Sequence, residues 1–319
     1  MPTVIAADDA MIDAGALREA LPADATVAVR PLPDAAAVRA AAGEAAALVV
    51  DVNTPVPAEA MAGLSVVARA GVGLDGVDLA AAAAEGVTVL HVPEYGTGEV
   101  ATHAVALLLS CCRHVCGYDR AVAGGRWDWT DGRPLRRLAG HTVGLVSFGP
   151  IARATADRLA GFGCDLAAYD PYVGADEMAD RGVEKLSVEE LGGVDHLSVH
   201  APLTEETRGL VGADLLAALP DHAVVVNTGR GGVVDEAALL DALEDGEIRA
   251  AGLDVLAAEP PGDNPLVGRE DVVLTPHAGW YSEEARDDLN RTLAADLRRA
   301  LAGEAPENAI DPEEPPYSG

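Results

Sequence analysis

The chain has 319 residues, of which 49% are hydrophobic and 3% aromatic, and its formal net charge is −30. This length favours about two domains with cores built from Ala, Val and Leu. The sequence has no run of 18 uncharged apolar residues and no basic segment at its start, so we expect neither a membrane span nor a secretory signal. The negative charge disfavours unassisted binding to nucleic acid or to an anionic membrane.

Arginine supplies almost all of the positive charge, because Lys185 is the only lysine. A soluble acidic protein is the simplest interpretation of this composition. Adaptation to high salt is the sharper one, because a dense carboxylate surface stays hydrated while salt screens its self-repulsion. The scarcity of lysine resembles the proteins of halophilic archaea, so we expect salt adaptation.

Three of the four cysteines, Cys111, Cys112 and Cys116, lie on one predicted helix, and the fourth is Cys164. Cys112 and Cys116 have the i, i+4 spacing that a metal pair could use. Since no second cluster offers further ligands, we expect no metal and instead buried free thiols in a reducing cytoplasm.

Residues 1–96 alternate between short apolar runs and helical patterns. Strands are expected at 3–6, 26–29, 47–51, 66–69 and 87–91, and helices at 14–20, 35–42, 57–62 and 78–84. This alternation is typical of a parallel sheet covered by helices, so the segment predicts one α/β domain. A long helix follows from about Gly98 to Gly117, and its apolar character on nearly all sides predicts burial. A loop with Trp127 and Trp129 comes next.

The stretch from His141 to Tyr172 has the pattern of a dinucleotide-binding unit. A strand at 142–148 leads through Gly149-Pro150 into a helix, and a second strand at 166–169 ends on Asp170. The start of the helix would hold a pyrophosphate, and Asp170 would accept hydrogen bonds from the ribose hydroxyls. The face of this helix that we expect to be apolar carries Ile151, Ala154, Thr155, Leu159 and Phe162.

The glycine motif departs from G-x-G-x-x-G, since its positions read Ser147-Phe148-Gly149-Pro150-Ile151-Ala152. Gly149 is the central glycine, which lets the backbone approach the phosphates, and Ala152 is small enough for close packing of helix on strand. Because Ser147 replaces the first glycine, this stretch alone leaves an ordinary βαβ crossover open as an alternative.

The α/β alternation resumes after Tyr172. Strands are expected at 196–199, 223–226, 250–253 and 272–275, and helices at 188–191, 214–219, 236–243 and 282–301. In a doubly wound sheet, ligands bind outside the carboxyl ends of the strands. The ends of these four strands carry functional groups, which we expect at one edge together with Gly149: His200, Arg230, Asp254 and His277.

Each of these residues also has an ordinary structural interpretation. Arg230, in NTGRGG, could be a surface arginine or could clamp a carboxylate bidentately. His277, in TPHAGW, could be a structural histidine, and Glu259, in AAEPP, an exposed carboxylate. Together they suggest a histidine that exchanges a proton and whose charged form a carboxylate favours. Asp254 could orient a nicotinamide amide or cap a helix.

Four long motifs in order make a family resemblance specific. HAPLTEETRGL, NTGRGGVVDEAAL, AGLDVLAAEPP and LTPHAGWYSEEA resemble the D-isomer-specific 2-hydroxyacid dehydrogenases, as do RAGVGLDGVD at 69–78 and PEYGTGEVATHAVALLL at 93–109. The similarity covers nearly the whole chain. PHAGWYS resembles the branch that contains the C-terminal-binding-protein corepressors and phosphoglycerate-dehydrogenase-like enzymes.

The resemblance implies a catalytic set. Arg230 would bind the substrate carboxylate and polarise the 2-oxo group, His277 would be the general acid in reduction, and Glu259 would keep His277 protonated. Formate dehydrogenases carry glutamine at the position of Glu259, so the carboxylate favours 2-oxo acid reduction. The substrate-binding residues that the resemblance implies are Val72, Gly73, Arg230 and Trp280.

The resemblance also implies a nicotinamide dinucleotide cofactor. NAD is favoured because the Asp170 carboxylate repels a 2′-phosphate, although salt screening leaves NADP open. The cofactor-binding residues would be Gly149, Pro150, Ile151, Asp170, His200, Pro202, Thr207, Thr228, Gly229, Arg230, Asp254, His277 and Gly279.

The expected architecture is α/β, with two Rossmann-like domains. Residues 1–96 plus 286–319 would form a flavodoxin-like substrate domain, and residues 97–285 an inserted NAD-binding Rossmann domain. The helix near 98–117 would help to form a homodimer. A regulatory domain of the kind that many phosphoglycerate dehydrogenases carry does not fit into 319 residues.

The expected function is NAD-dependent reduction of a small 2-oxo acid to the D-2-hydroxy acid in the cytoplasm. The alternative, from a different class, is a nucleotide-sensing regulatory protein with little turnover. The intact set of Arg230, Glu259 and His277 favours the enzyme. The side chain of the substrate is left open.

Overall fold

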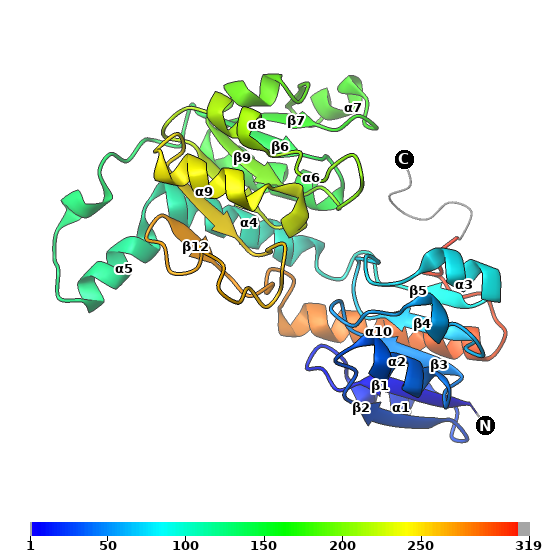
Figure 1. The fold of residues 1–319 in the computed structure, drawn as a ribbon. Coiled ribbons are helices and arrows are strands. Elements are labelled where there is room, and N and C mark those ends of the chain that lie inside the picture. The colour runs from blue at the N-terminus through cyan, green and yellow to red at the C-terminus, as the bar shows by residue number, and fades with distance from the viewer. Residues whose placement is uncertain (1, 312–319) are drawn as a thin grey trace. The chain divides into compact units, whose positions relative to one another are not determined.

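The structure, a computed structural model, describes residues 2–311. Its contacts divide the chain into two units, Met1–Tyr95 with Ser282–Gly319, and Gly96–Tyr281. Each unit is built on a parallel sheet with helices packed against it (Figure 1). This confirms the expected α/β fold class with two parallel sheets.

The first unit contains a five-stranded sheet with the order β2-β1-β3-β4-β5. All four pairings are parallel, and the order is that of flavodoxin-like folds. The strands are β1 (Thr3–Ala7), β2 (Thr26–Arg30), β3 (Ala47–Val50), β4 (Val66–Arg69) and β5 (Thr88–Leu90). The helices are α1 (Ala14–Ala20), α2 (Ala35–Ala42), α3 (Leu79–Glu85) and α10 (Glu283–Leu301).

Two buried polar residues of α10 bind this last helix to the first unit. Asn290 accepts the Asp13 N–H at 2.7 Å and donates its own side-chain N–H to the Met11 carbonyl at 2.9 Å. Asp296, which is 2% exposed, accepts the backbone N–H groups of Glu307 and Asn308. The chain therefore returns to its first unit after completing the second.

The second unit contains a seven-stranded sheet with the order β12-β11-β10-β9-β6-β7-β8. The six strands from β6 to β11 follow the Rossmann order, and the direction of winding reverses between β6 and β9. Its strands are β6 (Thr142–Val146), β7 (Asp165–Tyr169), β8 (Val183–Lys185), β9 (His196–Val199), β10 (Val224–Asn227), β11 (Ala250–Leu253) and β12 (Val272–Leu274).

Helices cover both faces of this sheet, so each face has its own aliphatic core. Val225 lies in one core cluster, while its neighbours Val224 and Val226 lie in the other. The helices are α4 (Thr97–Cys112), α5 (Val115–Ala123), α6 (Pro150–Leu159), α7 (Ala175–Ala179), α8 (Ala213–Ala218) and α9 (Glu236–Glu244).

The expected continuous helix from Gly98 to Gly117 is wrong, because the chain breaks between α4 and α5. His114 has a φ of 55°, in the left-handed region, which ends an α-helix. The two helices are bent by 62° at this break. Among residues 2–311, no single helix is long and apolar enough to cross a membrane, and α4 with α5 meets that standard only as a bent pair, by length and composition alone.

Short elements account for most other differences from the sequence-based expectation. The helix expected at 57–62 is a single 3-10 turn, Ala58–Ala60, because Gly63 follows with a φ of 85°. The helix expected at 188–191 is likewise a 3-10 turn, Glu190–Gly193. The edge strand β8 and the five-residue α7 were not expected, since neither is long enough to show a hydrophobic period.

The expected apolar face of α6 was right at Thr155 and Leu159, whereas Ile151 and Ala154 are only partly buried. Its buried side chains are Ala152, Thr155, Ala156 and Leu159, which follow the i, i+3, i+4, i+7 spacing. Phe162 lies beyond the helix, in a 3-10 turn, and is 42% exposed. The α-helical phase cannot be extended past Leu159, which explains the error at Phe162.

The expectation of four buried thiols holds for two of them. Cys111 and Cys112 are buried, whereas Cys116 and Cys164 are partly exposed, and all four are free. Burial raises the pKa of Cys112 to about 12, so its thiol stays protonated and unreactive. Because the break at His114 puts Cys112 and Cys116 on different helices, their i, i+4 spacing does not make a metal pair.

Candidate active site

The site lies in the second unit, at the carboxyl ends of four neighbouring strands. His200 follows β9, Arg230 follows β10, Asp254 follows β11 and His277 follows β12. Parallel pairing puts these strand ends on one edge of the sheet, beside Gly149 after β6. The alignment predicted from the sequence is therefore present.

Two glycines let the backbone at Arg230 pack closely against its neighbours. A β-carbon at Gly229 would come within 2.7 Å of the Ala201 carbonyl oxygen, and one at Gly231 within 2.0 Å of a Leu256 backbone atom. Close approach of backbone to backbone thus requires glycine on both sides of the arginine. The NTGRGG motif therefore fixes the backbone position from which the Arg230 side chain extends.

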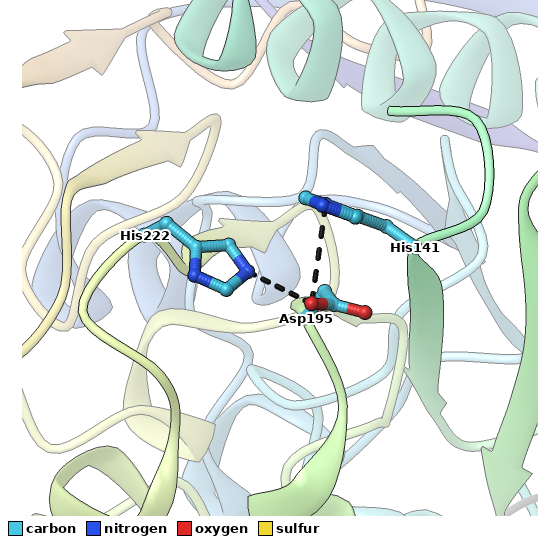
Figure 2. Close-up of side chains that lie close together, drawn as sticks. All are labelled: His141, Asp195 and His222. Atoms are coloured by element: carbon cyan, nitrogen blue, oxygen red, sulfur yellow. Dashed lines mark hydrogen bonds and ion pairs between the residues drawn. The ribbon is translucent and has the colours of Figure 1, made fainter. Parts of the chain in front are cut away.

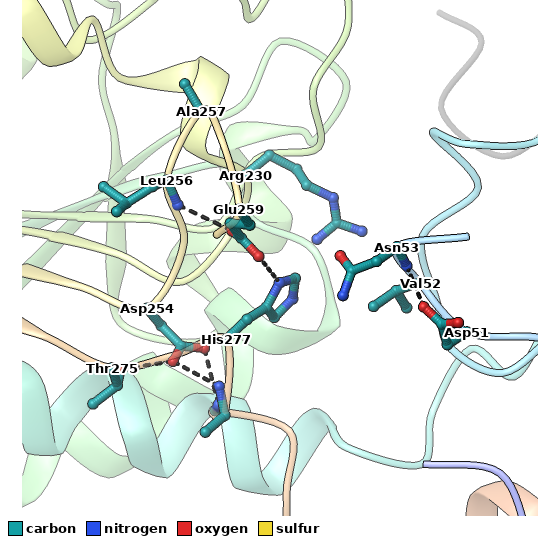
Figure 3. Close-up of polar contacts among 12 residues, drawn as sticks. Asp51, Val52, Asn53, Arg230, Asp254, Leu256, Ala257, Glu259, Thr275 and His277 are labelled. Atoms are coloured by element: carbon teal, nitrogen blue, oxygen red, sulfur yellow. Dashed lines mark hydrogen bonds and ion pairs between the residues drawn. The ribbon is translucent and has the colours of Figure 1, made fainter. Parts of the chain in front are cut away.

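His277 and Glu259 form a direct pair, drawn in Figure 3. Nδ1 of His277 lies 2.7 Å from Oε2 of Glu259, and each side chain is 26% exposed. Arg230 extends toward the same region in the close-up. His277 has a φ of 54°, a left-handed conformation that is uncommon outside glycine and concentrates at functional sites.

The environment of Glu259 favours its ionised form. Burial by itself raises the pKa of Glu259, but the hydrogen bond and charge of His277 outweigh this effect. The Leu256 N–H adds a hydrogen bond to Oε1 at 3.0 Å. The pKa of Glu259 is lowered as a result, so a carboxylate faces the imidazole at neutral pH.

Asp254 holds the loop that carries His277. Its carboxylate accepts the Thr275 hydroxyl at 2.6 Å and the N–H groups of Ala278 and Gly279 at 2.9 Å. A β-carbon at Gly279 would come within 2.8 Å of this carboxylate, which explains the glycine. Burial raises the pKa of Asp254, yet these donors and His103 together lower it.

His103 is a residue that the sequence analysis missed. Its Nε2 lies 2.8 Å from the Thr275 hydroxyl and 3.4 Å from Asp254. It comes from the middle of α4, far from the other strand ends in sequence. The signal for it was present in the segment PEYGTGEVATHAVALLL, where a lone histidine interrupts an apolar helix.

Hydrogen bonds hold the residues after β9 and β10 that we expect to touch the cofactor. His200 lies 3.0 Å from the Ser198 hydroxyl and 3.3 Å from the Thr228 hydroxyl. Thr207 donates to the Pro202 carbonyl at 2.6 Å. Burial lowers the pKa of His200 to about 4, so the ring is neutral and offers no charge to a ligand.

The glycine loop after β6 explains both Ser147 and Asp170. Ser147 has a φ of 78°, a conformation in which glycine is ordinarily found, so the family pattern of glycine has a physical reason here. Asp170 accepts the Phe148 N–H at 2.8 Å and the Tyr172 N–H at 2.9 Å. Asp170 therefore supports the turn, and its expected role at the ribose stays a prediction.

The start of α6 fits a pyrophosphate. Among the described residues, no side chain caps this helix at Gly149, so its first N–H groups face outward. A β-carbon at Gly149 would meet only the Ser147 hydroxyl, at 4.0 Å. The open space beside the glycine matches the role of the central glycine in dinucleotide motifs.

In the first unit, a buried arginine organises the loops after β3 and β4. Arg69, which is 1% exposed, donates to the carbonyls of Thr54, Val52 and Gly73. It therefore fixes the segment that contains Val72 and Gly73, two expected substrate-binding residues. The sequence analysis quoted Arg69 within RAGVGLDGVD but gave it no role.

Trp280, also expected at the substrate, packs edge-on against Tyr281 in the second unit, with ring centroids 5.5 Å apart.

Comparison with known proteins agrees with this geometry. Residues 105–279 match the NAD binding domain of the D-isomer specific 2-hydroxyacid dehydrogenases. A D-3-phosphoglycerate dehydrogenase from Mycobacterium bovis is 44% identical over 283 residues, which are 88% of this chain and 53% of that protein. A glyoxylate reductase from Korarchaeum cryptofilum is 39% identical over 278 residues, covering 84% of this chain and 83% of the relative.

A solved structure shares the whole fold. The NADPH-dependent glyoxylate/hydroxypyruvate reductase from Sinorhizobium meliloti, in complex with NADP and malonate, has a TM-score of 0.85 and 32% identity. The match covers 98% of this chain and 97% of that chain. The present chain spans about half the length of the phosphoglycerate dehydrogenases that it matches.

Fold and site together define an α/β protein with a dinucleotide-binding unit. The chain belongs to the D-isomer specific 2-hydroxyacid dehydrogenase family. Family membership confirms the resemblance found in the sequence and supports NAD or NADP as the cofactor.

Proposed function

We propose that the protein reduces a small 2-oxo acid to the D-2-hydroxy acid with NADH or NADPH. The observation that carries the proposal is the 2.7 Å pair of His277 and Glu259 on the sheet edge that also presents Arg230 and the dinucleotide loop. This reaction requires a proton donor, a group that binds the substrate carboxylate and a loop that binds the dinucleotide. Relatives named hydroxypyruvate reductase and glyoxylate reductase support it.

The residues divide the chemistry between them. Arg230 binds the substrate carboxylate and turns the 2-oxo group toward His277. A bound nicotinamide supplies the hydride. As the oxygen gains negative charge, the imidazolium of His277 donates a proton to it, and Glu259 stabilises that imidazolium beforehand. In the reverse direction His277 accepts the proton from the hydroxyl group.

We infer that Met1–Tyr95 with α10 is the substrate-binding unit and that Gly96–Tyr281 is the cofactor unit. Backbone N–H groups at Val72 and Gly73 would bind the carboxylate, and Trp280 would line the pocket for the substrate side chain. Arg69 supports this assignment, because a loop held by three hydrogen bonds can present its N–H groups in a fixed geometry.

One assay tests the function. NADH and NADPH consumption would be followed with glyoxylate, hydroxypyruvate, pyruvate, phenylpyruvate and 2-oxoisocaproate, each in dilute buffer and in molar KCl. The salt series is included because we also propose salt adaptation from the net charge of −30. Turnover of at least one acid is expected. Tight NADH binding without turnover on any of them would instead favour a nucleotide-sensing protein.

Asp170 is expected to set the choice between the two cofactors. Replacing Asp170 with Asn removes the charge that repels a 2′-phosphate and keeps an acceptor oxygen for one of the two backbone N–H groups, those of Phe148 and Tyr172, that Asp170 binds. Asp170→Asn should therefore raise kcat/KM with NADPH relative to NADH. Asp165→Asn, on the same strand but exposed, is the matched control. An unchanged ratio would mean that Asp170 serves the loop and not the ribose.

We also propose that the chain forms a homodimer through the cofactor unit. Figure 1 shows α5 and the chain after it extending away from the seven-stranded sheet. Trp127 and Trp129 on this segment are 89% and 71% exposed, and apolar surface of this size is typical of an interface. A second copy of the same segment is the occupant that symmetry favours.

The dimer proposal can be tested by sedimentation. The double variant Trp127→Gln, Trp129→Gln should shift the chain from dimer to monomer at micromolar concentration, because it removes the two largest exposed apolar side chains. Phe162→Gln, a partly exposed aromatic elsewhere in the unit, should leave the dimer intact. A wild-type monomer would contradict the proposal.

The expected cytoplasmic location also stays a proposal. The four free cysteines support it, because exported proteins more often pair their thiols.

A further inference from the structure

A cluster of three histidines and one aspartate lies away from the candidate active site. His141 precedes β6, Asp195 and His196 stand at the start of β9, and His222 precedes β10. These positions are the amino ends of parallel strands, whereas the active-site residues follow the carboxyl ends. The chain has eight histidines, so three of them gather at this one place.

Three atoms of the cluster converge on one point, as Figure 2 shows. His222 Nε2 lies 2.8 Å and His141 Nδ1 lies 4.0 Å from Oδ1 of Asp195. All three atoms lie within 4.8 Å of one another. A tetrahedral ion with bonds of about 2.0–2.1 Å separates its ligand atoms by roughly 3.3 Å, and the two measured distances bracket that value.

The surroundings orient two of the three groups. The Thr142 N–H donates to Oδ2 of Asp195 at 2.8 Å, which turns the other oxygen, Oδ1, toward the histidines. Asp221 lies 3.6 Å from Nδ1 of His222, so the hydrogen of that ring can point to a carboxylate and leave Nε2 as a ligand. A carboxylate behind a ligating histidine is the usual support in metal sites.

His196 has a different part in the cluster. The Val224 N–H donates to Nδ1 of His196 at 3.2 Å, so the hydrogen of that neutral ring is on Nε2. This Nε2 lies 3.1 Å from Nδ1 of His141, and because that nitrogen has one lone pair, the contact must open when His141 binds an ion. His196 is therefore not a ligand, since its one free nitrogen carries a hydrogen.

We propose that His141, Asp195 and His222 bind a transition-metal ion, with zinc as the chemical class that two imidazoles and one carboxylate favour. Water would complete the coordination, because the three side chains are 19%, 28% and 18% exposed and solvent can reach them. The ion would join the starts of β6 and β9 to the turn before β10. Its role is to stabilise the cofactor unit, since the ligands lie at the edge opposite the dinucleotide loop.

The charges around the cluster and its donor atoms bear differently on the choice of metal. Arg136 and Arg249 line a small cavity beside His196 and His222, and they disfavour any cation. Arg249 donates to the carbonyls of Gly132 and Pro134, which hold its guanidinium in place. The donor set selects the ion, because a hard ion such as Mg²⁺ needs several carboxylates, whereas two imidazoles and one carboxylate favour an ion with strong affinity for imidazole.

The test is equilibrium dialysis of the purified full chain against Zn²⁺, together with the visible spectrum of bound Co²⁺. One ion per chain is expected, with a tetrahedral Co²⁺ spectrum and a Zn²⁺-dependent rise in Tm. Asp195→Asn and His222→Gln should each lower the affinity at least ~10-fold. His114→Asn removes a histidine outside the cluster, keeps a residue that tolerates the left-handed φ, and should bind as the wild type does.

Three results would overturn the proposal. They are the absence of stoichiometric Zn²⁺, equal affinity in both cluster variants and the wild type, and a Co²⁺–thiolate absorption band that would assign the ion to cysteines. His222→Gln keeps the test valid if Asp195→Asn fails to fold, because it leaves the Asp195–Thr142 bond intact. NADH binding should persist in every folded variant, so a lost metal site is separable from a lost active site.

Discussion

His277→Ala is expected to lower the rate of 2-oxo acid reduction by at least ~10²-fold, the lower range for loss of a general acid. The proton that the 2-oxo oxygen needs then has to come from water. The variant also removes the hydrogen bond and the charge of His277 that lower the pKa of Glu259, and it leaves the Leu256 N–H as a donor to that carboxylate. Steady-state kinetics together with NADH fluorescence measure the two effects separately. NADH should still bind.

The backbone at His277 requires a second variant. A φ of 54° is unfavourable for alanine, so His277→Ala could also disturb the loop that Asp254 holds. Asparagine tolerates this conformation, and His277→Asn should therefore show the same loss of turnover with the loop intact. His114→Asn, at another left-handed histidine, is the matched control and should retain full activity. Retained turnover in His277→Asn would show that another group delivers the proton.

The fold was largely predictable because its pattern is local. Each buried parallel strand is a short aliphatic run, and several helices begin at an aspartate or serine that caps them, such as Asp34 or Ser282. The helix boundary that the sequence predicted wrongly depends on a single backbone angle. The left-handed φ of His114 divides one apolar helix into α4 and α5, and no side-chain pattern signals it.

The sequence predicted those residues of the candidate site that lie at the ends of strands. Arg230, Asp254 and His277 each follow an aliphatic strand, and a doubly wound sheet brings such positions together. Contacts between distant segments could not be derived in this way. His103 reaches Thr275 across 172 positions of sequence, and only the packing of α4 on the sheet determines that contact.

The cluster at the opposite edge illustrates the same limit. His141, Asp195 and His222 precede their strands, so no rule about ligand-binding edges draws attention to them. Their spacing in sequence also matches no metal motif. A sequence-based expectation of no metal followed from the cysteines, whereas the candidate ligands are imidazoles and one carboxylate that the parallel register assembles.

Arg230→Gln is expected to lower kcat/KM for the 2-oxo acid by at least ~30-fold, which corresponds to about 2 kcal/mol for removing one partner of a hydrogen-bonded charge pair. Glutamine can donate to the substrate carboxylate but carries no charge and no planar fork. The loss should appear mainly in KM if Arg230 only binds, and in kcat as well if it also polarises the 2-oxo group. Steady-state kinetics over a substrate series distinguish these outcomes.

Arg230→Lys separates charge from geometry. Lysine keeps the positive charge but cannot make two parallel hydrogen bonds, so the activity of this variant should lie between that of the wild type and that of Arg230→Gln. Arg181→Gln, an exposed arginine paired with Asp157 on the far part of the cofactor unit, is the control and should leave kcat/KM unchanged. Since Gly229 and Gly231 fix the backbone independently of the side chain, both Arg230 variants should fold and bind NADH. Wild-type kcat/KM in Arg230→Gln would remove the carboxylate clamp from the mechanism and leave the His277–Glu259 pair without a means of orienting its substrate.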